Sequence, residues 1–178
     1  IEVISNAAYE VNKIAKDNIS IMATDFTVKS KIYLRKIKEK NKDMKITQIV
    51  CKKLCPIIEN GWESFENRFE ILNNYIKKID SNSDSLLLAC THYPLIIKDI
   101  KKVLKENKKN IKKIIEPSRP TALSVKKYLK ENNILNNNFN EKKRLIIYTT
   151  SNYINKSKNL LNVFLDNKKY KLELVNLD

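Results

Sequence analysis

The spacing of apolar residues is the feature that most restricts the fold of this chain. Short apolar runs such as 85–89 alternate with longer stretches such as 95–105, in which apolar side chains recur at helical intervals. Runs of this length suit buried strands, and the longer stretches suit amphipathic helices. Strands that alternate with helices favour a parallel sheet covered on both faces. We therefore expect an α/β fold with a mostly parallel sheet flanked by helices.

The predicted elements keep this alternation along the whole chain. The Asn-rich stretch 132–140 interrupts it and is a candidate linker or crossover. The predicted helices cover 7–15, 28–40, 62–79, 95–105, 122–130 and 154–165, and the predicted strands cover 19–23, 45–50, 86–89, 111–115, 144–148 and 171–175, with a turn at 24–27 and a loop around 55–56.

The composition excludes several classes of protein. Gly61 is the single glycine among 178 residues, which rules out a Gly-rich phosphate loop and argues against dinucleotide and P-loop functions. Three cysteines, an odd number, favour reduced thiols over a disulfide framework. No apolar run is long enough to span a bilayer, and Ile1 does not open a signal-peptide pattern. We expect a cytoplasmic protein without membrane contact, whose start at Ile1 fits either processing or a missing front segment.

The net charge of +15 raises the question of nucleic-acid binding. All but four of the 35 basic residues are lysines, whereas base-edge contacts and bidentate phosphate contacts favour arginine. The lysines alternate with Ile, Val and Leu along helical stretches such as 98–113. This pattern is typical of a solvated lysine-rich surface, so we do not expect a nucleic-acid partner.

The segment Cys90-Thr91-His92-Tyr93-Pro94 carries the strongest chemical signal. It follows the predicted strand 86–89 and opens the predicted helix 95–105, where a proline is tolerated in the first turn. Ligands of open α/β sheets bind at such strand ends. The helix N-terminus and the imidazole of His92, the only histidine, both favour the thiolate form of Cys90. The alternative is a packed, unreactive cysteine.

Two further segments hold candidate residues. Thr24 and Thr27 follow the predicted strand 19–23, where they could hold a carboxylate or simply cap the next helix. Glu59 could orient and charge an imidazole, or it could lie on the surface. Cys51 and Cys55 have a spacing compatible with metal, but one such pair and one distant histidine fall short of a tetrahedral set, so we expect no metal.

Together these segments resemble bacterial glutamate racemases. The resemblance implies interconversion of L- and D-glutamate without a cofactor, for peptidoglycan synthesis, by two cysteines on opposite faces of the substrate α-carbon. The supporting motifs are T-x-x-T-x-x-S-x-x-Y (Thr24, Thr27, Ser30, Tyr33), P-x-x-E-x-G (Pro56, Glu59, Gly61) and C-T-H-Y-P (Cys90 to Pro94).

The resemblance also implies roles for individual residues. Cys90 matches one of the two thiols, His92 matches its acid–base partner, and Glu59 matches the acidic residue associated with that histidine. Thr91 and His92 match the substrate-contact pair beside the thiol, and Thr24 and Thr27 match threonines of the same cleft. Ala89 replaces a more usual glycine and Lys52 a more usual proline, and both changes look tolerable.

The family has an earlier half that nothing in this sequence matches. That half carries an Asp-Ser pair in a Gly-rich start and a Cys-Asn-Thr segment with the first thiol, a role that we assign to neither Cys51 nor Cys55. We expect the C-terminal portion of a glutamate racemase, truncated and inactive. Residues 1–112 would form one complete racemase-type domain. Residues 113–178 would complete a second domain by pairing with the absent N-terminal half. Without that half, formation of a homodimer or a rearrangement would cover the apolar face left open.

Two other functions stay open at this stage. One is a non-catalytic binding module derived from a racemase, whose basic surface contacts nucleic acid or an acidic protein. The other is a cysteine hydrolase, for which the sequence singles out neither an oxyanion hole nor a leaving-group acid.

Overall fold

The computed structural model describes residues 1–136, 145–150, 161–162, 164–165 and 169–176. Contacts divide the chain into two units, Ile1–Ile134 and Leu135–Asp178. The first unit contains, in chain order, α1 (Val3–Ile14), β1 (Asn18–Ala23), α2 (Asp25–Ser30), α3 (Ile32–Lys38), β2 (Lys45–Val50), α4 (Leu54–Glu59), the 3-10 helix η1 (Trp62–Ser64), α5 (Arg68–Ile76), β3 (Ser85–Leu88), the 3-10 helix η2 (Tyr93–Ile96), α6 (Ile97–Glu106), β4 (Lys113–Ile115) and α7 (Ser118–Glu131).

A parallel four-stranded sheet forms the centre of the first unit. Its strand order is β2-β1-β3-β4, and every neighbouring pair is parallel. Each connection crosses through helices, as parallel neighbours require. The α/β class with a mostly parallel sheet flanked by helices, expected from the alternating pattern, is therefore confirmed.

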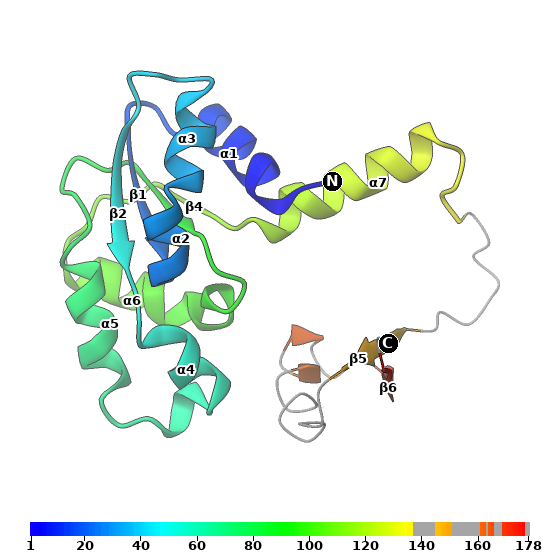
Figure 1. Cartoon of the computed structure of the whole chain (residues 1–178). Coiled ribbons are helices and arrows are strands. Elements are labelled where there is room, and N and C mark those ends of the chain that lie inside the picture. Colours follow the sequence, from blue (N-terminus) through cyan, green and yellow to red (C-terminus); the bar gives the residue numbers. More distant parts are fainter. Residues whose placement is uncertain (137–144, 151–160, 163, 166–168, 177–178) are drawn as a thin grey trace. The chain divides into compact units, whose positions relative to one another are not determined.

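Helices cover both faces of this sheet (Figure 1). Ile19, Ile21 and Leu87 belong to one buried cluster with residues of α1 and α3. Met22 and Leu88 belong to a second cluster with residues of α4, α5 and α6. Successive strand residues point to opposite faces, so a strand buried on both sides is apolar throughout, which explains the continuous apolar runs in the sequence.

Three differences from the predicted elements have local causes. The predicted helix 28–40 is two helices, α2 and α3, because Lys31 adopts a left-handed conformation with φ of 53°. The predicted helix 62–79 is a 3-10 turn followed by α5. The predicted loop around residues 55–56 is α4, in which Leu54, Ile57 and Ile58 are buried. In each case tertiary packing or one backbone conformation overrides the local pattern.

The division of the chain also differs in position from the expected one. We expected a boundary after residue 112, whereas the contact-defined boundary lies between Ile134 and Leu135. Strand β4 pairs with β3 and α7 contacts α1, which places residues 113–134 in the first unit. Figure 1 shows α7 extending away from the sheet past α1, and none of its residues is buried.

The second unit contains a small parallel sheet. Strands β5 (Ile146–Thr149) and β6 (Lys171–Leu174) pair in register, with Ile146 opposite Lys171. Most of the predicted helix 154–165 and part of the predicted linker 132–140 lie outside the described residues. Among the described residues, no helix combines the length and apolar character needed to cross a membrane.

Candidate active site

The sheet topology gathers the candidate residues at one edge. Strand β1 lies between β2 and β3, so the chain leaves β1 toward one side of the sheet and later returns to the other. The carboxyl ends of β1 and β3 therefore flank a topological switch point, where ligands of open α/β sheets bind. Thr24 follows β1, and Cys90 follows shortly after β3. Just before Cys90, the backbone amide of Ala89 donates a hydrogen bond to the backbone carbonyl of Met22 in β1.

Cys90 lies against a second thiol. Its Sγ is 3.1 Å from the Sγ of Cys55, which is presented by α4, and both side chains are half-buried. This contact was not predicted from the sequence, because 35 residues separate the two cysteines. A thiol donates to a thiolate more favourably than to another thiol, so the contact stabilises the ionised form of one of the two.

His92 joins this thiol pair to a carboxylate. Its Nδ1 is 3.7 Å from the Cys90 Sγ, and its Nε2 is 3.1 Å from Oε1 of Glu59. The histidine side chain is 19% exposed and the glutamate side chain 37%. The two ring nitrogens therefore face different partners, the arrangement that fixes the tautomer and orientation of an imidazole. The structure brings together Cys90, His92 and Glu59.

Of the two cysteines in contact, Cys90 has the lower pKa and carries the negative charge. The bond from Cys55, helped by the backbone amide and ring of His92, lowers the pKa of Cys90 to about 6 against the opposing effect of burial. The same bond raises the pKa of Cys55 above its usual range, and burial raises it further. At neutral pH Cys90 is a thiolate and Cys55 is its hydrogen-bond donor.

The third cysteine takes no part in this cluster. Cys51 is 1% exposed, and burial raises its pKa to about 12. The backbone carbonyl of Cys51 accepts a hydrogen bond from the hydroxyl of Tyr93, which is fully buried. These two residues secure the segments after β2 and β3 to each other behind the site.

The two threonines after β1 contact each other at the start of α2. Thr24 caps α2: its Oγ1 accepts from the backbone amide of Thr27 at 3.3 Å and lies 2.9 Å from the Thr27 Oγ1. The capping interpretation is confirmed, and both residues remain partly exposed. Thr91 is exposed beside the site, with its Oγ1 3.3 Å from Nδ1 of His92. Their contact with a substrate stays a prediction.

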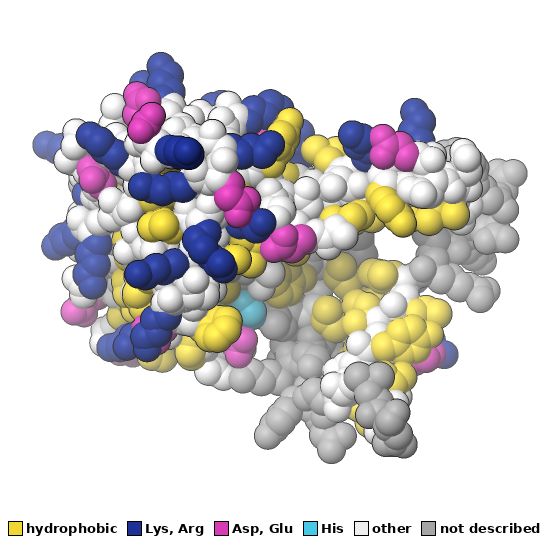
Figure 2. Space-filling model, turned by 45° about the horizontal axis from the view of Figure 1, so that its top comes forward, with side chains coloured by type: hydrophobic (Ala, Val, Ile, Leu, Met, Phe, Trp, Pro, Cys, Tyr) yellow, Lys and Arg dark blue, Asp and Glu magenta, His cyan; other side chains and the backbone are white. Residues whose placement is uncertain are grey.

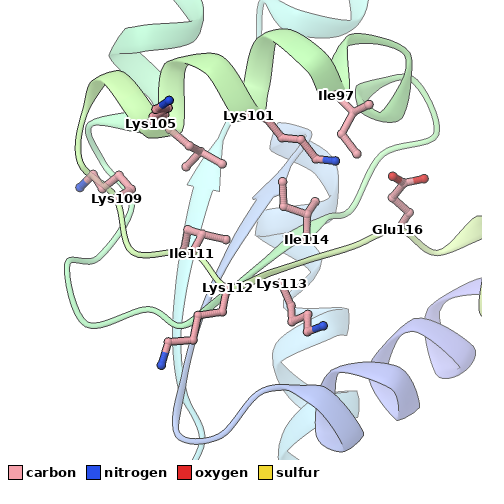
Figure 3. Close-up of a pocket in the computed structure, with 10 residues that line it drawn as sticks. Ile97, Lys101, Lys105, Lys109, Ile111, Lys112, Lys113, Ile114 and Glu116 are labelled. Atoms are coloured by element: carbon pink, nitrogen blue, oxygen red, sulfur yellow. The ribbon is translucent and has the colours of Figure 1, made fainter.

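A separate groove of about 500 Å³ lies between α6 and β4, and lysines form half of its lining. Figure 3 shows Lys112 and Lys113 pointing away from α6 rather than toward Lys101. Lys109 donates to the backbone carbonyls of Lys77 and Ile79. No cysteine or histidine lines the groove. Its lysines therefore do not converge on one point as an anion site requires.

The wider surface supports the same interpretation. Figure 2 shows Lys and Arg side chains spread across the visible face of the first unit, with Asp and Glu side chains among them. Such interspersed charges are typical of a solvated surface rather than of a nucleic-acid footprint.

Comparison with known proteins finds glutamate racemases that are similar to this chain in sequence and in fold. The chain is 41% identical over 102 residues to a glutamate racemase of Fusobacterium nucleatum. The matched segment makes up 57% of this chain and 36% of the Fusobacterium protein. It is 34% identical over 125 residues to a glutamate racemase of a Thermoanaerobacter species, and this match covers 70% of this chain and 44% of the relative. The crystal structure of the Francisella tularensis glutamate racemase in complex with D-glutamate superposes with a TM-score of 0.85 and 28% identity.

By sequence and by fold, this chain belongs to the glutamate racemase family. The superposition on the Francisella structure covers 100% of this chain and 64% of the Francisella chain. The superposition on a glutamate racemase isoform of Bacillus anthracis covers 98% of this chain and 64% of the Bacillus chain, with a TM-score of 0.84 and 25% identity. No family model matches the chain. The chain spans about two fifths of the length of the curated glutamate racemases it matches.

Proposed function

We propose that this chain supplies one half of a glutamate racemase active site. In this proposal Cys90 is the acid–base group for one face of the substrate α-carbon, His92 exchanges protons with it, and Glu59 holds the imidazole. The observation that carries the proposal is the contact chain from Cys90 to His92 to Glu59, together with a Cys90 pKa of about 6. A base with a pKa near the working pH is well suited to proton transfer.

The remaining contacts would bind glutamate. Thr24 and Thr27 lie at the end of β1, and Thr91 lies beside Cys90, so their hydroxyls are available to the substrate carboxylates and ammonium group. Removal of a proton next to a carboxylate builds negative charge that fixed donors must stabilise. The reaction needs no cofactor, because the thiolate removes the proton directly. The product, D-glutamate, would enter peptidoglycan synthesis in the cytoplasm.

A single thiol cannot invert the substrate. Inversion requires a second acid on the opposite face, and with reacting atoms 3–3.5 Å apart the two sulfurs would stand about 6–7 Å from each other. The Sγ atoms of Cys55 and Cys90 are 3.1 Å apart, so no carbon fits between them. Cys51 is buried. The three cysteines of these 178 residues therefore provide acid–base chemistry on one face only.

The rest of the racemase would come from a second domain. We propose that residues 113–178 help to complete that domain, and that in its absence the exposed apolar face of α7 is covered by a second copy of this chain. The exposed Leu123 and Tyr128 on α7 support this proposal.

The test is exchange of the α-proton of each glutamate enantiomer in deuterated water, followed by NMR and chiral chromatography. We expect deuterium incorporation into one of the two enantiomers, with retained configuration, and no incorporation after Cys90→Ser. The Cys51→Ser variant, which alters a thiol outside the cluster, is the matched control. Interconversion of the enantiomers at ordinary enzymatic rates would refute the one-face assignment. A folded chain that exchanges neither enantiomer would instead favour a non-catalytic binding module.

A further inference from the structure

We propose that Cys55, Cys90 and His92 form a binding site for a soft divalent transition metal ion, represented by Zn²⁺. One donor atom from each of the three residues lies within 4.8 Å of the other two. Cys55 comes from α4, whereas Cys90 and His92 come from the segment after β3, so the fold rather than the sequence spacing assembles the set. This inference is independent of the proposed racemase function and replaces the expectation of no metal.

The distances are close to those of a tetrahedral zinc site. Zn–S bonds of 2.3 Å and Zn–N bonds of about 2.05 Å place two sulfurs about 3.8 Å apart, and a sulfur and a nitrogen about 3.6 Å apart. The distance from the Cys90 Sγ to the His92 Nδ1 is 3.7 Å, and that between the Sγ atoms of Cys55 and Cys90 is 3.1 Å. The site requires the two thiols to separate by about 0.7 Å, which small side-chain rotations supply.

Glu59 provides the carboxylate that holds the metal-binding histidine in place. Metal-binding histidines usually donate the hydrogen of their other ring nitrogen to a carboxylate, which fixes the ring and strengthens it as a ligand. Here Nδ1 lies 3.7 Å from the Sγ of Cys90, and Nε2 lies 3.1 Å from Oε1 of Glu59. The imidazole is therefore already turned with its donor nitrogen toward the metal position.

The donor set also selects the kind of metal. Two thiolates and an imidazole favour Zn²⁺ and Co²⁺ over Mg²⁺ and Ca²⁺, which prefer oxygen ligands. Binding replaces the proton of Cys55, and any proton remaining on Cys90, with two metal–sulfur bonds, and these protons pass to solvent. Three protein ligands leave a fourth position open to water or a small anion. A bound metal occupies the Cys90 sulfur and so competes with its acid–base chemistry.

The test is titration of the reduced, metal-free protein with Co²⁺, which reports thiolate ligation by a charge-transfer absorption band. We expect one Co²⁺ per chain, displaced by Zn²⁺ and unaffected by excess Mg²⁺. The Cys55→Val variant should lose the thiolate band, and Cys51→Val, which removes a thiol outside the cluster, should retain it. Glu59→Gln should weaken the affinity by about 10- to 100-fold, the usual effect of substituting the carboxylate that holds a metal-binding histidine.

Circular dichroism checks that each variant folds. The Cys55→Ser variant is a second substitution of the same thiol, by a side chain close to cysteine in size. Metal binding that persists unchanged in both Cys55 variants would overturn the proposal. So would reduced protein that binds neither Co²⁺ nor Zn²⁺ but forms a Cys55–Cys90 disulfide on oxidation. An unsubstituted chain that binds neither Co²⁺ nor Zn²⁺ but exchanges the α-proton of glutamate would overturn the metal site and leave the proposed function standing.

Discussion

At the scale of single residues, the site depends on an asymmetry between two neighbouring cysteines. Cys90 has a backbone amide and an imidazole beside it, whereas Cys55 has Cys90 itself as its main polar partner. The sulfur with more donors ionises first, and its charge then keeps the proton on the other. One thiolate and one thiol in contact are the result, and the proposed proton transfer depends on that pair.

Substitution of the imidazole tests the proton relay. His92→Asn should slow α-proton exchange by about 10²- to 10⁴-fold, the usual contribution of a positioned acid–base group. Glu59→Gln should slow it less, because the ring remains and only its orientation and charge suffer. Enantiomer-resolved NMR in deuterated water measures both rates, and glutamate affinity measured separately distinguishes lost chemistry from lost binding. Rates equal to that of the unsubstituted chain would remove His92 from the mechanism.

The sequence predicted part of this arrangement. Cys90 and His92 could be placed because they are two residues apart after a clear strand, and Glu59 because it lies in a recognisable motif. Cys55 was missed because its contact with Cys90 spans 35 residues and depends on α4, a helix that the local pattern around Pro56 did not indicate. The helical spacing of the apolar residues Leu54, Ile57 and Ile58 was the available signal.

At the scale of elements, α4 positions half of the site, and the turn after it requires a glycine. Gly61 follows α4 with φ of 101°, and a Cβ at this position would lie 3.2 Å from the Ser64 Oγ. This backbone conformation is rarely adopted by other residues. The turn lets Glu59 end one helix while Trp62 returns to the core, where its Nε1 donates to Asp99 at 2.6 Å.

Substitution of this glycine should therefore destabilise the first unit. We expect Gly61→Ala to lower the free energy of unfolding by about 1–3 kcal/mol, the usual cost of a strained backbone conformation. Chemical denaturation followed by circular dichroism measures the change. The double variant Gly61→Ala, Ser64→Ala removes the side-chain contact but keeps the backbone strain, so it should remain destabilised. Full recovery in the double variant would show that the contact, rather than the backbone, is responsible.

The elements themselves were predictable to different degrees. The strands of the first sheet were placed within two residues of their observed ends. The central strands β1 and β3 are buried along their whole length, which accounts for their apolar runs. The break between α2 and α3 was not predictable, because a lysine at a positive φ gives no sequence signal. The early start of α7, at Ser118 rather than residue 122, reflects the tolerance of Pro120 in a first helical turn.

At the scale of the whole molecule, α7 carries an apolar surface that the first unit does not bury. The exposed fractions are 58% for Leu123, 38% for Val125 and 51% for Tyr128. Neighbouring apolar side chains exposed on one helix mark an interaction surface. In the proposed account a second copy covers them when the other racemase domain is absent.

Charge placed on this surface should prevent association. The Leu123→Lys, Tyr128→Lys double variant is expected to sediment as a monomer at concentrations where the unsubstituted chain sediments as a dimer. Ser81→Lys, which adds a charge at an exposed position outside α7, is the control and should remain dimeric. Sedimentation equilibrium measures all three proteins. An unsubstituted chain that is monomeric at every concentration would contradict the homodimer.

The account as a whole depends on ionisation of the Cys90 sulfur near pH 6, below the ordinary thiol value of 9.0. The most direct test is the rate of alkylation by iodoacetamide across pH, in the presence of a chelator, with each modified cysteine located by peptide mass spectrometry. The account predicts that Cys90 reacts first, with a midpoint near 6, and that Cys55→Val moves this midpoint upward because it removes the principal donor. A Cys90 midpoint near 9, unchanged by Cys55→Val, would contradict it.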